Sequence, residues 1–335
     1  MTTIYDIAKA AGVTATTVSN VLSGKGSVSA VTRARVLKYA HELEYQPNLI
    51  ARSLIKGRTG VIGLVIPFID NPFYAEIVAI VERLAYNAGL RVFTTTLPLN
   101  DQIGQKMLRD LIARRVDGIL VTSGAWTQHI THTIVTPHFP SVYCFWEDEQ
   151  QASTLCVPID LAQGGRQAAE HLLALGHRRI GILTHINDDG SYVHQSRVSG
   201  FQSALADYGI AFDPAYFGAG QTSMEESKVA AYHLLTHPDP PTAIFATNDV
   251  MAIGVLSAAW ELGLRIPHDL SLVGFDDIAQ ARYLTPPLTT VAIDKTTILA
   301  MAVQLLLAAI EGQAVASSPV FPVTLTIRSS TGFCS

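Results

Sequence analysis

The chain has 335 residues, of which 48% are hydrophobic and 15% charged, a composition typical of a globular protein with two or three domains. Its three cysteines are far apart, form neither a disulfide framework nor a metal-site spacing, and indicate a reducing compartment. The sequence shows no signal-peptide pattern and no apolar run long enough to span a membrane. We therefore expect a cytoplasmic protein without a membrane partner.

The net charge of −5 is distributed unevenly along the chain. Residues 1–58 hold eight Lys and Arg against three Asp and Glu, a local charge of +5, so the remainder carries −10. A basic N-terminal segment on an acidic body suits an anionic partner for that segment alone. A solvated basic helix face would give a similar count, so charge by itself leaves the partner open.

The first 21 residues carry the pattern of two short helices joined by a tight turn. Thr3 begins a capping-box-like sequence, and Gly12 stands where the chain must reverse sharply. Thr14 can cap a second helix, which has one apolar and one polar face. This spacing is that of a helix-turn-helix, whose second helix enters the DNA major groove, although an ordinary pair of packed helices would look similar.

A third helix is predicted over 30–43, where Ser29 provides the cap, and it would close a small core with the first two. Pro47 ends this head. Residues 48–57 predict a short helix with Asn48 as its cap and Gly57 as its end. A helix of this length is marginal in water, so we expect it to form only when something packs against it.

From residue 60 onward, strands and helices alternate. The apolar run 60–66 is typical of a buried parallel strand, and the helix after it has apolar residues at helical spacing as far as Ala88. Such alternation predicts an α/β fold with doubly wound parallel sheets, and the body is too long for one sheet of this kind. We expect two lobes with a cleft between them, built on strands near 60–66, 90–95, 118–121, 141–145, 179–184, 243–247 and 270–275. The segment 288–294, an apolar helix at 297–310 and the segment 320–327 could add elements to both lobes.

Short motifs recur in order along the whole chain. The head contains IYDIA at 4–8, GVT at 12–14 and TVS at 17–19, followed by YQPN at 45–48 and ARSL at 51–54. The body contains DNPFY at 70–74, VDGI at 116–119, LGHRRI at 175–180, RVSGF at 197–201, TND at 247–249, VGFDD at 273–277 and PLTT at 287–290. Together and at this spacing, they resemble the lactose-repressor (LacI/GalR) family of transcriptional regulators.

The resemblance implies a domain organisation. We expect a three-helix helix-turn-helix head at 1–46, a hinge helix or linker at 47–58, and an effector-binding and dimerisation body at 59–335. The body would have a two-lobed, periplasmic-binding-protein-like fold, with an N-lobe at about 60–160 plus 294–319 and a C-lobe at about 161–293 plus 320–335. Lactose-type relatives form tetramers through a C-terminal heptad helix that this chain lacks, so a homodimer is expected.

The family binds double-stranded operator DNA with two heads, so a pseudo-palindromic operator is implied. Asn20 is suited to bind adenine, while the methyl groups of Ala15 and Thr16 are suited to touch thymine. Leu54 matches the family's minor-groove wedge, although it could instead pack between two hinge helices. The residues expected to contact DNA are Thr3, Tyr5, Thr14, Ala15, Thr16, Thr17, Ser19, Asn20, Asn48, Ser53 and Leu54.

The resemblance also implies a small-molecule effector in the interlobe cleft. Arg197 corresponds to the family arginine that holds ligand hydroxyls or a carboxylate. Asn248 and Asp276 follow predicted strand ends, where the crevice of such sheets lies. Arg197 and Asp276 could instead form a structural ion pair, and Asn248 could simply cap its helix. The residues expected to bind the ligand are Phe73, Trp146, Arg197, Asn248 and Asp276.

Two positions depart from the family pattern. Many relatives have Asp-Arg where this chain has Phe145-Trp146. The aromatic residue that often closes the pocket is replaced here by Gln221-Thr222. Trp146 could substitute for that aromatic against the face of a sugar ring, or it could be an ordinary packing residue. The identity of the effector is therefore left open.

These observations favour a ligand-responsive, sequence-specific DNA-binding regulator, most simply a repressor, with a sugar or sugar derivative as its effector. One alternative is a co-repressor-dependent regulator that responds to a nucleobase-like ligand. Another is a solute-binding protein, which the head and the lack of a signal peptide disfavour. No catalytic constellation, cofactor fingerprint or metal-ligand spacing is visible, so we expect no enzyme activity, cofactor or metal.

Overall fold

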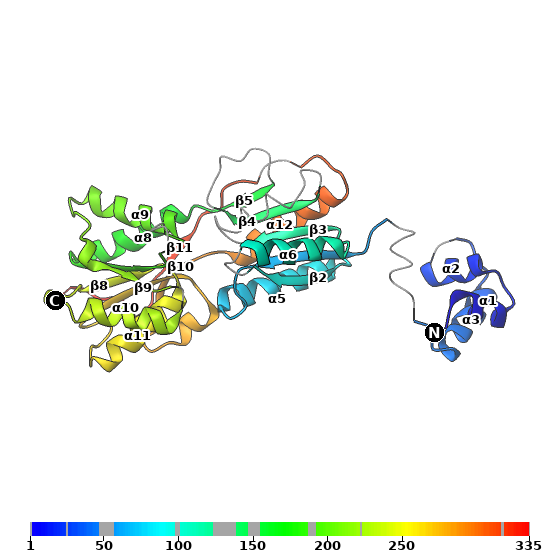
Figure 1. Ribbon diagram of the computed structural model, residues 1–335, viewed down its shortest axis with the longest axis horizontal. Helices are drawn as coiled ribbons and strands as arrows, with labels where there is room; N and C mark the ends of the chain where they lie inside the picture. The colour runs from blue at the N-terminus through cyan, green and yellow to red at the C-terminus, as the bar shows by residue number, and fades with distance from the viewer. Residues whose placement is uncertain are drawn as a thin grey trace. The chain divides into compact units, whose positions relative to one another are not determined.

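The computed structural model describes residues 2–24, 26–46, 57–97, 101–122, 139–146, 155–186, 192–221, 223–315 and 318–334 (Figure 1). The chain forms two compact units, residues 1–59 and 60–335. The helix expected at 48–57, and with it Asn48, Ser53 and Leu54, lies outside the described residues apart from Gly57. Among the described residues, no helix is long and apolar enough to cross a membrane.

The head consists of the helices α1 (Ile4–Ala11), α2 (Ala15–Ser23) and α3 (Ala30–Glu42). Thr3 forms a capping box at the start of α1, and the hydroxyl groups of Thr14 and Ser29 cap α2 and α3. Gly12 ends α1 with a φ of 64°, which reverses the chain without steric cost. The helix-turn-helix is therefore confirmed, and its core consists of Ile7, Ala8, Ala11, Val18, Val21 and Val36.

The N-lobe is built on a five-stranded parallel sheet with the strand order β2-β1-β3-β4-β5. The central strands are almost fully buried, as the apolar runs predict, because helices cover them. α12 follows the C-lobe strand β10 in the chain but belongs to the N-lobe, where it packs against α5, β3 and β4 (Figure 1). The elements are β1 (Val61–Ile66), α5 (Pro72–Asn87), β2 (Arg91–Thr96), α6 (Asp101–Ala113), β3 (Gly118–Thr122), β4 (Ser141–Trp146), β5 (Cys156–Pro158) and α12 (Lys295–Ile310).

The C-lobe is built on a six-stranded sheet with the strand order β11-β10-β9-β8-β6-β7, parallel except for β11. Figure 1 shows α8 and α9 on one face of this sheet and α10 and α11 on the other. The elements are α8 (Leu161–Ala174), β6 (Ile180–Thr184), α9 (Gln195–Asp207), β7 (Phe217–Ala219), α10 (Met224–Leu235), β8 (Ala243–Ala246), α11 (Asp249–Glu261), β9 (Ser271–Asp276), β10 (Thr289–Ala292) and β11 (Thr324–Thr326), with 3-10 turns at Pro214–Tyr216 and Ala279–Tyr283.

The predicted α/β class, with a helical head and two doubly wound lobes, is confirmed. Sequence patterns missed the strands β5 and β7, which have three residues each and are too short to produce a periodic signal. The apolar stripe of α5 ends at Ala85, whereas Ala88 is exposed at the helix end. These differences leave the positions of the main strand ends unchanged.

Candidate functional site

The first candidate site is the solvent side of α2 in the head. Thr16 and Ser19 are exposed, as the helix-turn-helix pattern predicts. Ala15 and Asn20 are only partly exposed, because Ala15 packs against the head's core and the Asn20 amide lies beside the loop at Gly26. A Cβ at Gly26 would lie 3.2 Å from Asn20 Nδ2, so a larger residue there would crowd this amide. α2 therefore presents small and polar side chains with restricted freedom.

The hydroxyl groups expected at the DNA backbone lie near the helix N-termini. Tyr5 is 72% exposed, and Thr3 and Thr14 are exposed caps of α1 and α2. The hydroxyls of Thr14 and Thr17 are 2.9 Å apart, so they are already oriented by each other. Helix N-termini favour anions through their free N–H groups, and this placement is compatible with phosphate contacts.

The second candidate site lies at the carboxyl ends of β6, β8 and β9, which are neighbours in the C-lobe sheet. Ligands of open α/β sheets bind at this edge. The segment that follows β8 begins with Thr247 and Asn248, and β9 ends at Asp276. Arg197 reaches the same edge from α9, so the structure brings Arg197, Asn248 and Asp276 together as expected.

Close packing of α8 against α9 fixes the position of Arg197. A Cβ on Gly165 would lie 1.9 Å from the carbonyl oxygen of Arg197, and a Cβ on Gly200 would lie 1.9 Å from that of Ala162. Only glycine permits this backbone-to-backbone approach. The two glycines therefore set the depth at which the Arg197 side chain enters the sheet edge.

Arg197 is held by three contacts. Its Nη1 group donates to the carbonyl oxygen of Thr247 at 2.6 Å and to Asp276 Oδ1 at 3.0 Å. Its guanidinium lies over the Phe275 ring, 3.9 Å from the centroid. The side chains of Arg197 and Asp276 form a buried ion pair, which was the alternative to a ligand-binding role. The pair leaves the Arg197 Nε group without a partner in a buried position.

The backbone around Asp276 adopts an unusual conformation for residues other than glycine. Asp276 has a φ of 106° and Asp277 a φ of 44°, both in the left-handed region. Such conformations persist where surrounding contacts enforce them, and they cluster at functional sites. Here the Lys295 ammonium group donates to the carbonyl oxygens of both residues, at 2.9 and 3.0 Å, and Arg328 pairs with Asp277 at 2.6 Å.

Asp249 is a buried carboxyl group beneath this turn. Thr290 Oγ1 donates to Asp249 Oδ1 at 2.6 Å, and the N–H of Ile278 donates to Asp249 Oδ2 at 2.9 Å. Burial raises the pKa of Asp249 well above its ordinary value, and the nearby Asp276 carboxylate raises it further. Burial also raises the pKa of Asp276, while Arg197 and Lys295 oppose that effect. The arrangement favours a neutral Asp249 beside a charge-paired Asp276.

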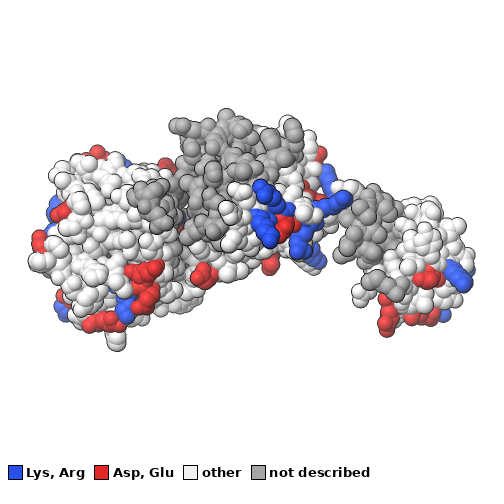
Figure 2. All heavy atoms as spheres, in the orientation of Figure 1, with Lys and Arg blue, Asp and Glu red and all other residues white. Residues whose placement is uncertain are grey.

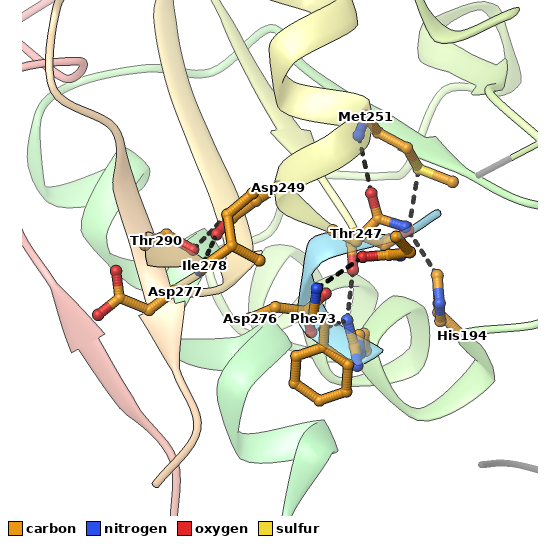
Figure 3. Close-up of polar contacts among 12 residues, drawn as sticks. Phe73, His194, Thr247, Asp249, Met251, Asp276, Asp277, Ile278 and Thr290 are labelled. Carbon is orange, nitrogen blue, oxygen red and sulfur yellow. Dashed lines mark hydrogen bonds and ion pairs between the residues drawn. The ribbon is translucent and has the colours of Figure 1, made fainter. Parts of the chain in front are cut away.

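Two histidines border the same site. His194 Nδ1 lies 2.9 Å from the hydroxyl of Thr247 (Figure 3). The Thr247 hydroxyl in turn donates to the hydroxyl of Thr184 at 3.0 Å. Burial lowers the pKa of His194 well below its ordinary value, and Arg197 and His185 lower it further. Burial also lowers the pKa of His185, which follows β6 directly. Both imidazoles are therefore neutral near pH 7.

Contacts between the two lobes meet at the same place. Glu76 of α5 accepts the N–H of Ala279 at 2.7 Å and pairs with Lys295 at 3.0 Å. Phe73, also on α5, is buried against Phe145 with ring centroids 5.4 Å apart, and the Lys295 ammonium lies 5.3 Å from its centroid. Lys295 thus contacts both the Phe73 ring and the carbonyl oxygen of Asp276, so the predicted site residue Phe73 lies close to Asp276.

The remaining two predicted ligand residues have different outcomes. Asn248 is 2% exposed, and its Oδ1 accepts the N–H of Met251 at 2.7 Å, so it does cap α11. A ligand contact by Asn248 stays a prediction. Trp146 ends β4, but its side chain lies outside the described part of the structure. Among the described residues, no group of three or more His, Cys, Asp or Glu could hold a metal ion.

Sequence reasoning missed several residues at this site, namely Glu76, His185, His194, Asp249 and Lys295. Lys295 and Asp249 carry a weak signal, because each is a charged residue that begins a largely apolar helix shortly after a strand. Glu76 and the histidines carry no such signal, since their roles depend on contacts between distant parts of the chain.

Comparison with known proteins identifies both parts of the chain. Residues 3–48 match the model of bacterial regulatory proteins of the lacI family, and residues 169–331 match a periplasmic binding protein-like domain. The HTH-type transcriptional repressor PurR of Haemophilus influenzae (strain ATCC 51907 / DSM 11121 / KW20 / Rd) is 34% identical over 308 residues, which cover 92% of this chain and 90% of that protein.

Solved structures resemble the whole chain. A lac repressor dimer bound to operator and the anti-inducer ONPF is similar over 99% of both chains, with a TM-score of 0.87 and 29% identity. A LacI family regulator from Enterococcus faecium with bound ribose covers 82% of this chain and is itself covered completely, with a TM-score of 0.73 and 27% identity. The chain thus belongs to the LacI family and is a DNA-binding transcriptional repressor with a ligand-binding domain.

Proposed function

We propose that this repressor acts as a homodimer in the bacterial cytoplasm and binds a pseudo-palindromic operator. The two α2 helices would enter successive major grooves, where Ala15, Thr16 and Asn20 read bases. The exposed polar face of α2 and the net charge of +5 on residues 1–58 support this role. The similar lac repressor structure is a dimer bound to operator, and this supports the proposal of the same assembly here.

We further propose that a small polar molecule, a sugar or sugar derivative, binds where the lobes meet and controls the operator affinity. The observation that carries this proposal is the buried Arg197–Asp276 pair with its unused Nε–H at the carboxyl edge of the sheet. Lys295 and Glu76 connect this edge to the N-lobe. A ligand that alters these contacts would change how the lobes meet, and a coupling of about 1–3 kcal/mol changes affinity roughly 5- to 150-fold.

The test is the binding of the full-length protein to DNA from the promoter beside its own gene, followed by fluorescence anisotropy. The titration is repeated with sugars, sugar derivatives and nucleobases. Weakened binding with a sugar supports an inducer-gated repressor. Strengthened binding with a nucleobase supports the alternative, a co-repressor-dependent regulator. Operator affinity that no compound changes would count against ligand control.

A further inference from the structure

Two buried polar atoms at the sheet edge lack a hydrogen-bond partner. They are Arg197 Nε and His185 Nδ1, and no other such side-chain atom occurs in the described part of the chain. Each of the two residues is only 7% exposed. Val193, which precedes His194, donates its N–H to the carbonyl oxygen of His185, and both His194 and Arg197 contact Thr247, so the two atoms belong to one cluster. An unpaired buried polar group destabilises a protein, and two in one place indicate that another molecule completes the hydrogen bonds.

The chemistry of these two atoms restricts that molecule. The Nε–H of Arg197 can only donate, so the molecule must present an acceptor to it. His185 is a neutral imidazole, because burial lowers its pKa, and its two ring nitrogens therefore comprise one donor and one acceptor. A hydroxyl group both donates and accepts, so neighbouring hydroxyl groups satisfy both atoms with either His185 tautomer.

The charges beside Arg197 are paired, and Glu226 adds a negative charge near His185. Arg197 pairs with Asp276 at 3.0 Å, and Lys295 pairs with Glu76 at 3.0 Å. Asp277 is likewise paired with a cation, Arg328, at 2.6 Å. Asp249 adds no charge when it is protonated, as its raised pKa favours. Among the described residues, the three cations that contact Asp276, Asp277 and Glu76 therefore already have carboxylate partners, and the burial of an uncompensated anion beside them is costly.

Several other cations of the described body are exposed at the surface, among them Arg282 in the 3-10 turn that follows Asp277. Figure 2 shows Lys and Arg gathered on the outer surface over α6, which carries the exposed Lys106 and Arg109 and precedes Arg114 and Arg115. The body segments outside the described residues contain no Lys or Arg. Those segments instead contain Glu147, Asp148, Glu149, Asp188 and Asp189. The body segments outside the described residues therefore supply no Lys or Arg cation, and the described cations in contact with Asp276, Asp277 and Glu76 already have carboxylate partners.

We propose that the effector is an uncharged molecule with adjacent hydroxyl groups, a free sugar or polyol, and that His185 helps Arg197 to select it. The proposal rests on the ligand control proposed above and narrows its chemistry. It excludes phosphorylated and carboxylated sugars as the preferred ligands. It also assigns a specificity-determining role to His185, a residue that the sequence motifs do not single out.

The test is equilibrium dialysis of the full-length protein against matched compounds, with the retained fraction measured by mass spectrometry at constant ionic strength. The probes are ribose, glucose, galactose and cellobiose, the corresponding monosaccharide phosphates, gluconate, hypoxanthine and guanine. Retention of a neutral sugar at least 10-fold above its charged derivative is expected. Preferred retention of a phosphate or carboxylate would overturn the proposal. Retention of nothing, or of a nucleobase alone, would contradict the sugar-controlled function on which it rests.

Two substitutions with matched controls test the residues. His185→Leu should weaken sugar retention about 10-fold or more by removing one hydrogen-bond partner, whereas His233→Leu, at an exposed position on α10, should not.

Glu76→Gln removes the carboxylate opposite Lys295 and keeps an acceptor for the N–H of Ala279. It should reduce the preference for a sugar over its phosphate several-fold, and the exposed Glu82→Gln on the same helix should not. Equal sugar retention by the His185 variant and its control would contradict the role of His185, and an equal sugar-over-phosphate preference of the Glu76 variant and its control would contradict the role of Glu76.

Discussion

The head and the C-lobe place their polar side chains in opposite environments. In the head, Thr3, Thr16 and Ser19 lie at the surface above a small apolar core. In the C-lobe, Arg197 and Asp276 are buried and paired with each other. Surface groups exchange water for a partner at small cost, whereas buried groups must find matched partners or destabilise the protein. The head is therefore suited to reversible contact with a large polyanion, and the C-lobe to selection of one small molecule.

The largest expected effect is the loss of unfolding free energy when a buried ion pair, rather than an exposed one, is broken. Asp276→Asn keeps the side-chain shape and tolerates a positive φ, but it leaves the buried Arg197 guanidinium without its counter-ion. The free energy of unfolding of the body should fall by about 3 kcal/mol, as measured by urea denaturation of the full-length protein. The control is Asp269→Asn, because Asp269 pairs with the largely exposed Arg265, and little change is expected. Similar losses of unfolding free energy in the two variants would contradict the contrast between buried and exposed ion pairs.

The next effect tests base reading by the head. Asn20→Ala should lower the affinity for the operator about 10-fold or more and leave the affinity for random DNA nearly unchanged. Fluorescence anisotropy with both DNA sequences measures the difference, and Ser23→Ala, near the end of α2, serves as a control. Equal losses on operator and random DNA would show that Asn20 does not read bases.

The pH dependence of stability should arise in the C-lobe. The pKa values of His171, His177, His185 and His194 are all lowered, chiefly by burial, so the unfolded chain binds protons more readily than the folded chain. These four histidines should therefore lower the free energy of unfolding as the pH drops below about 6.5, by up to about 1.4 kcal/mol per pH unit each, while the raised pKa values of Asp249 and Asp276 act in the opposite direction.

Urea denaturation between pH 5 and pH 8 measures this slope. His194→Gln should reduce it, because Gln does not titrate and can still hydrogen-bond to the hydroxyl of Thr247. An identical slope in the variant would contradict the role of His194.

The smallest expected effect concerns the start of α2. Thr14→Ala removes the cap and should destabilise the head by about 1 kcal/mol. Because Thr14 is also expected to contact the DNA backbone, operator and random DNA should lose affinity alike. Thermal unfolding of the head and anisotropy with both DNA sequences provide the measurements. A loss confined to the operator would assign Thr14 to base reading instead.

Local patterns predicted most of the fold and part of the site. The caps at Thr3 and Thr14 and the apolar strands follow from neighbouring residues, and parallel strands place their carboxyl ends at one edge, which predicts Asn248 near Asp276. The position of Arg197 beside Asp276 is implied by the family resemblance alone. The contact between Glu76 and Ala279 joins residues 203 positions apart, and no periodicity encodes it. The same is true of His185, whose missing partner becomes evident only once the surrounding contacts are known.

The central claim is that a molecule at the Arg197–Asp276 pair controls operator binding by the head. The most direct test is the operator affinity of the full-length protein as the neutral sugar retained in dialysis is titrated. Arg197→Lys serves as the comparison because it keeps the positive charge beside Asp276 and loses the Nε–H. We expect the sugar to change the wild-type affinity about 5-fold or more and the variant's affinity hardly at all. An equal response in both proteins would contradict the account.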